Sequence, residues 1–60
     1  MLDTTRDATL RTYGEMKRRG VSEPRAFENA LIVFRHHMPD IVSEDAQFIV
    51  ADWICEELGQ

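Results

Sequence analysis

The chain has 60 residues and a net charge of −4, with 43% hydrophobic and 30% charged residues, a balance that is typical of a folded domain and argues against a disordered chain. Sixty residues make one domain, 1–60, and bury only about 60% of the surface that the unfolded chain exposes, so we expect marginal stability. The single cysteine, Cys55, excludes a disulfide within the chain, and there is no run of 18 apolar residues to span a membrane. We therefore expect a cytoplasmic protein.

The charges are divided unevenly along the chain. Residues 1–38 hold all 7 Lys and Arg residues and 5 acids, whereas residues 39–60 hold 6 acids and no base. This asymmetry predicts ion pairs between the two halves, or between two copies of the chain. It also argues against a chain whose main task is to bind nucleic acid, because phosphates repel acidic side chains.

The first predicted element is a helix over residues 4–19. Asp3 or Thr4 can cap its start, basic residues crowd its end, where they suit the helix dipole, and Gly20 can take the left-handed position after it. Acid-first pairs at i, i+4 are expected between Asp7 and Arg11 and between Glu15 and Arg19. The apolar stripe is narrow and consists of Leu2, Thr9, Leu10, Tyr13 and Met16.

The second predicted helix covers residues 23–38. Ser22 is a favourable N-cap, Pro24 fits the first turn, and Pro39 forces the helix to end before it. Its apolar face consists of Ala26, Phe27, Ala30, Leu31, Val33, Phe34 and Met38. Ile32 lies in the middle of the polar face, so we expect it to be exposed in a monomer.

The third predicted helix covers residues 44–58, with Ser43 as its cap and Gly59 closing it. Its apolar residues spread over roughly 260° of the circumference, and its polar strip is acidic, with Asp45, Asp52 and Glu56. Two neighbouring helices of the same chain can cover only part of so wide an apolar surface. The sequence therefore predicts an all-α, three-helix domain that self-associates into a helical bundle.

The His, Cys, Asp and Glu residues of the sequence show no spacing that is typical of a catalytic or metal site. The candidate zinc ligands are His36, His37, Asp40, Cys55 and Glu56, which include histidine, cysteine and carboxylate ligands. However, adjacent histidines point about 100° apart on a helix, and no CxxC or HExxH pattern supplies further ligands. We expect His37 on the core or interface side, His36 in solvent and Cys55 as a small buried residue. Neither enzymatic activity, a cofactor nor a metal ion is expected.

Protein–protein association is the function that the sequence favours, in a homodimeric adaptor or regulatory protein. The candidate contacts are Ile32, Phe34, Met38, Phe48, Trp53 and Ile54. Aromatic and Met side chains commonly anchor such interfaces. The alternative is a nucleic-acid-binding regulator that uses the basic end of the first helix, with Lys17, Arg18, Arg19 and Arg25. Binding to a membrane surface is not expected, because anionic lipid would repel the acidic strip of the most apolar helix.

Overall fold

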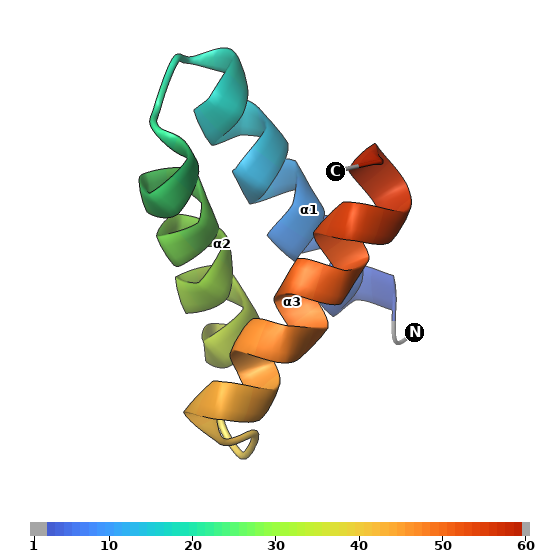
Figure 1. Cartoon of the computed structure of the whole chain (residues 1–60). Coiled ribbons are helices and arrows are strands. Elements are labelled where there is room, and N and C mark those ends of the chain that lie inside the picture. The colour runs from blue at the N-terminus through green and yellow to red at the C-terminus, as the bar shows by residue number, and fades with distance from the viewer. Residues whose placement is uncertain (1–2, 60) are drawn as a thin grey trace.

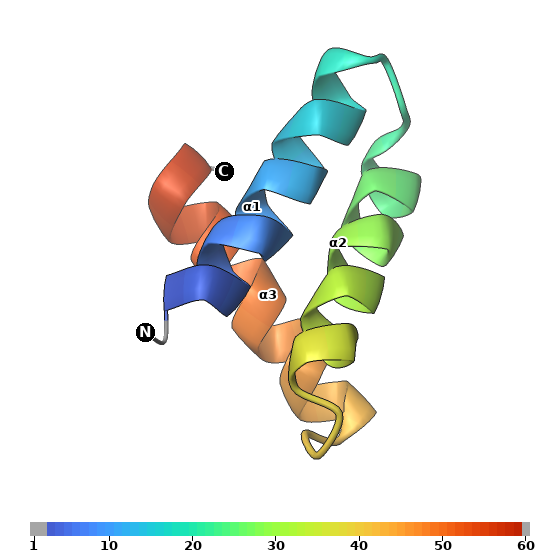
Figure 2. The same ribbon diagram turned by 180° about the vertical axis from the view of Figure 1, so that it is seen from behind.

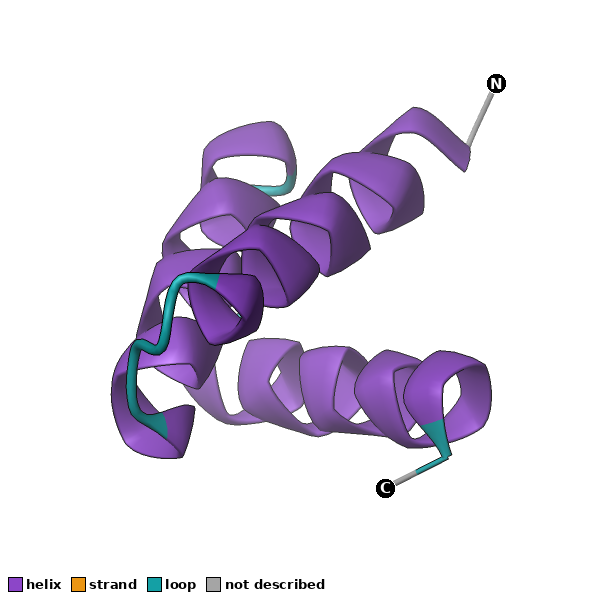
Figure 3. Cartoon of the chain, turned by 90° about the horizontal axis from the view of Figure 1, so that it is seen from above, coloured by secondary structure: helices purple, strands orange, loops and turns teal. Residues whose placement is uncertain are grey.

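The computed structural model describes residues 3–59, and three helices make up most of that range: α1 (Asp3–Arg18), α2 (Glu23–His37) and α3 (Ser43–Leu58). The all-α, three-helix prediction is confirmed, and each helix begins and ends within one residue of its predicted bounds. Helices α1 and α2 run antiparallel, side by side, and α3 crosses them at an angle (Figures 1 and 2). Viewed from above, α3 forms a separate layer beneath this pair (Figure 3).

A glycine with a left-handed backbone conformation follows both α1 and α3. Gly20 has a φ of +86°, and the Val21 N–H donates to the Met16 carbonyl at 2.9 Å, which satisfies a carbonyl of the last turn. Gly59 has a φ of +70°, and its N–H donates to the Cys55 carbonyl at 3.0 Å. Both glycines take the left-handed conformation that the sequence predicts for them, which a residue with a Cβ adopts at a cost.

The starts of α2 and α3 differ in how well the sequence predicts them. Ser22 takes the N-cap position of α2 with extended backbone, as expected, although its side chain makes no capping hydrogen bond. The prediction that Ser43 caps α3 is wrong, because Ser43 is already helical and Val42 holds the extended N-cap position. Valine has no side-chain acceptor for the first N–H groups of the helix, so this end lacks a side-chain cap.

The core lies between the three helices. Its buried apolar residues are Tyr13, Ala26, Ala30, Phe34, Ala46, Val50 and Ile54. Alanines on α2 and α3 allow the backbones to approach closely, and the larger rings fill the remaining space. The narrow stripe predicted for α1 supplies Tyr13 and the buried Thr9, whereas Leu2 lies outside the described residues. No helix within residues 3–59 is both long and apolar enough to cross a membrane.

A hydrogen-bonded network joins α1 to the start of α2. The Tyr13 hydroxyl donates to Glu23 Oε2 at 2.6 Å, and Lys17 Nζ donates to Glu23 Oε1 at 2.9 Å. Burial, and secondarily the Glu23 carboxylate, raises the pKa of Tyr13 to about 12. The hydrogen bonds from Tyr13 and Lys17 lower the pKa of Glu23. The network therefore favours a neutral phenol beside an ionised carboxylate.

Candidate functional site

The described residues include large hydrophobic side chains that remain well exposed: Ile32, Met38, Val42, Phe48 and Leu58. Phe48 is 75% exposed and Ile32 is 62% exposed. Ile32, Met38 and Phe48 are thus placed where a partner can reach them, as their predicted role requires.

Two of the predicted contacts lie in the core. Phe34 is 1% exposed and Ile54 is also buried, so each leaves at most a small part of its side chain at the surface. The prediction of these two as exposed partner contacts is wrong for the folded chain, because both belong to the buried core. Trp53 is half-buried: its ring meets that of Phe34 edge to face, with the centroids 5.4 Å apart.

Next to this aromatic pair lies a groove of about 370 Å³, here called the tryptophan groove. Its apolar lining comes from the end of α2, the following loop and the middle of α3, through Phe34, Met38, Ile41, Ile49 and Trp53. Arg6 of α1 also lines the groove, and its guanidinium carbon lies 5.9 Å from the centroid of the Trp53 ring. Such a cation above an aromatic ring is an electrostatically favourable contact.

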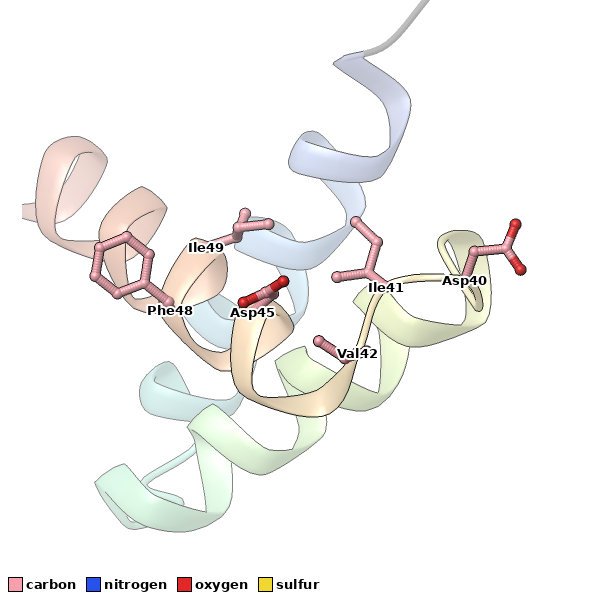
Figure 4. Close-up of a pocket in the computed structure, with 6 residues that line it drawn as sticks. All are labelled: Asp40, Ile41, Val42, Asp45, Phe48 and Ile49. Atoms are coloured by element: carbon pink, nitrogen blue, oxygen red, sulfur yellow. The ribbon is translucent and has the colours of Figure 1, made fainter.

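A second hollow, of about 420 Å³, continues from the tryptophan groove and is here called the α3 hollow. Ile41 and Ile49 line both spaces, and the remaining lining residues are Asp40, Val42, Asp45 and Phe48. Figure 4 shows the Asp45 carboxylate between the α3 pair Phe48 and Ile49 and the loop residues Ile41 and Val42, with Asp40 further out. The two hollows are therefore adjacent, and the Asp45 carboxylate lines only the α3 hollow.

The sequence did not reveal the loop residues of this surface. Val42 is 61% exposed and Ile41 packs partly against the core, but both lie between α2 and α3, outside any helical wheel. Periodicity assigns a face only to residues within a regular element. The one available signal was the pair of adjacent β-branched residues in the connection between the two helices.

Ion pairs join the two oppositely charged parts of the chain, as predicted. Arg6 Nη2 lies 3.4 Å from Glu56 Oε1 and 3.3 Å from Glu57 Oε1, which links α1 to the end of α3. The predicted pair within α1 between Asp7 and Arg11 also forms, at 3.0 Å. These contacts are solvent-exposed, so each contributes at most about 1 kcal/mol.

Glu15 departs from the predicted pairing. Its carboxylate lies 3.9 Å from Arg18 Nη2 rather than beside Arg19. The i, i+3 and i, i+4 positions are both neighbours on a helix surface, and Arg19 lies beyond the end of α1, where the helical spacing no longer applies.

The basic residues considered for nucleic acid are all exposed: Lys17, Arg18, Arg19 and Arg25. Two of them already have acidic partners, since Lys17 contacts Glu23 at 2.9 Å and Arg18 contacts Glu15 at 3.9 Å. A phosphate group would have to compete with these carboxylates for the two cations.

The described residues contain no group of three or more His, Cys, Asp or Glu side chains that could hold a metal ion. His37 is exposed and does not lie in the core of the chain. Its Nδ1 lies 3.0 Å from the Val33 carbonyl oxygen. Cys55 is exposed, so the expectation that it is buried is also wrong. Helix α3 buries Ala46, Val50 and Ile54 along a single side, which leaves Cys55 turned towards solvent.

Comparisons of the chain with protein-family models, with curated proteins and with solved structures find no match. The function is therefore inferred from the residues and their arrangement.

Proposed function

We propose that this chain is a non-catalytic protein-binding module, an adaptor or regulatory protein that associates with a second copy of itself. The observation that carries the proposal is the exposure of Phe48 beside the α3 hollow and the tryptophan groove. An exposed aromatic ring next to a continuous apolar depression is typical of a binding surface, whereas scattered exposed hydrophobic residues are not.

A second copy is the occupant that the composition of the chain favours. A 60-residue domain buries a small core, and such domains commonly gain stability by oligomerisation. The α3 hollow contains Asp45 and borders a helix without a single base, so its partner must supply positive charge together with apolar side chains. Residues 1–38 of the chain itself carry that excess of positive charge.

Replacing Phe48 by serine tests this proposal. We expect sedimentation equilibrium of the wild type to show a monomer–dimer equilibrium, and F48S to weaken dimerisation by about tenfold or more, because the variant removes the largest exposed apolar side chain of the surface. Leu58→Ser is the matched control, since Leu58 is also exposed on α3 but lines neither hollow. L58S should dimerise like the wild type. A wild-type chain that remains monomeric at millimolar concentration would contradict the proposal.

Nucleic-acid binding remains the alternative, supported by the exposed Arg19 and Arg25, which have no ion pair among the described residues. Retention on heparin or DNA at low salt that disappears at moderate salt would favour it. The self-association proposal predicts that the acidic chain passes through such a column.

A further inference from the structure

Charged residues without an ion pair fall into two groups on different helices of the described chain. The unpaired bases lie at the end of α1 and on α2, as Arg19, Arg25 and Arg35. Most of the unpaired acids lie after α2, in the loop and on α3, as Asp40, Glu44, Asp45 and Asp52. Pairing within the chain thus leaves a basic surplus and an acidic surplus in separate places.

The basic surplus on α2 surrounds an exposed apolar side chain. Ile32 shares a shallow depression with Arg35, His36 and Pro39. Arg25 lies two helical turns before Ile32, on the same side of α2, and Glu28, one turn before it, is the acid of this surface. We call this surface, formed by Arg25, Glu28, Ile32, Arg35 and His36, the outer face of α2. It presents one large aliphatic group together with two arginines, one glutamate and one histidine.

The α3 hollow has the complementary character. Its walls are apolar, through Ile41, Val42, Phe48 and Ile49, and the Asp45 carboxylate lies among them with no ion pair to any described residue (Figure 4). A carboxylate inside an apolar surface loses hydration when a partner covers it, so the partner must bring a cation to that point. The outer face of α2 offers an aliphatic side chain and a guanidinium three residues apart, on one side of a helix.

We propose that the outer face of α2 of one copy docks on the α3 hollow of a second copy, with Ile32 covering the apolar walls and Arg35 pairing with Asp45. This inference rests on the proposed self-association and names the two surfaces that make the contact. The proposed contact would cover the three most exposed large hydrophobic side chains of the described residues, Phe48, Ile32 and Val42. Repeated about a two-fold axis, the same contact would close a homodimer.

A dimer built by packing α3 against α3 is electrostatically disfavoured. It would place Asp45 and Asp52 of one copy against the same acids of the other, with no base on either α3 to separate them. Like charges facing each other across an interface are repulsive, whereas the pairing of α2 with α3 joins opposite charges.

Two charge reversals and their mixture test the proposed contact. Arg35→Glu and Asp45→Arg should each weaken self-association by roughly tenfold in sedimentation equilibrium, because each places like charges in the contact. An equimolar mixture of R35E and D45R should regain wild-type affinity. In the mixed dimer the glutamate introduced on α2 of one copy faces the arginine introduced on α3 of the other, while the reciprocal contact keeps its original residues.

Net charge gives an internal control. D45R lowers the magnitude of the net charge from −4 to −2, so general repulsion between copies would predict tighter association, the opposite of our expectation. Arg19→Glu is the matched control for R35E: both arginines are exposed, lie at the end of a helix and lack an ion pair, and both reversals bring the net charge to −6. R19E should dimerise much more tightly than R35E.

Circular dichroism must first show that R35E, D45R and R19E are as helical as the wild type. Equal weakening by R35E and R19E, unchanged or tighter association of D45R, or a mixture no tighter than the single variants would each overturn the contact while leaving self-association intact. A monomeric wild type that binds a cationic amphipathic peptide at Phe48, seen as chemical-shift changes, would overturn both proposals and assign the surface to a different protein.

Discussion

Tyr13 and Glu23 form the residue-level contact whose energetics depend most clearly on pH. The folded chain raises the pKa of Tyr13 from 10.0 to about 12, so the folded state retains the phenolic proton over a range where the unfolded chain loses it. The contribution of Tyr13 to stability is therefore complete below pH 10 and is lost as the pH rises towards 12. The lowered pKa of Glu23 acts in the opposite direction, and its contribution is lost as the pH falls through the acidic range.

Tyr13→Phe tests this contact. We expect the melting temperature of the wild type to fall between pH 10 and 12 and that of Y13F to fall less over the same range, because phenylalanine has no proton to lose. Thermal unfolding followed by circular dichroism at constant protein concentration measures both. Parallel curves for the two proteins would contradict the assignment of the alkaline loss of stability to Tyr13.

The burial of single residues was harder to predict than the helices that carry them. The broad apolar surface of α3 led to the prediction that Cys55 is buried, because a helical wheel shows the spread of apolar residues and not the position of their neighbours. In the folded chain Cys55 is exposed, as is Phe48, because α3 meets α1 and α2 along one side only. Ile32 was predictable, since it alone interrupts a polar face.

At the scale of the helices, the boundaries follow from local signals. Gly20 and Gly59 in the left-handed conformation and Pro39 after α2 act on their nearest neighbours, so the sequence reveals where these helices end. The start of α3 was misplaced because a serine adjacent to the true cap looked more favourable than Val42. The residue pattern therefore predicted α3 but not its first residue.

Val42→Ser separates the stability of α3 from association. Serine at this extended N-cap position supplies the missing side-chain acceptor, so we expect the free energy of unfolding of the dilute monomer to rise by about 1 kcal/mol. The same substitution removes an apolar wall of the α3 hollow and should weaken dimerisation.

Urea unfolding at low protein concentration and sedimentation equilibrium at high concentration measure the two effects of V42S. Opposite directions support the assignment of Val42 to the binding surface. A variant that gains stability and dimerises like the wild type would show that this wall is outside the contact.

For the whole molecule, the sequence predicted the class of fold but not the surface that we propose as the binding site. Hydrophobic periodicity and caps specify the three helices, whereas the α3 hollow is assembled from a loop and a helix whose relative placement depends on packing. The uneven distribution of charge was visible from the beginning. The sequence did not show which of these charges pair within the chain, and the ion pairs of the folded chain identify those that remain without a partner among the described residues.

The most direct test of self-association is the melting temperature of the wild-type chain as a function of its concentration. If a second copy covers the α3 hollow in the folded state, mass action requires the melting temperature to fall as the protein is diluted. Circular dichroism melts over a hundredfold concentration range, with mass measured by light scattering at each end, provide the measurement. We predict a lower melting temperature and a smaller mass on dilution; a constant melting temperature together with a monomeric mass throughout would contradict the account.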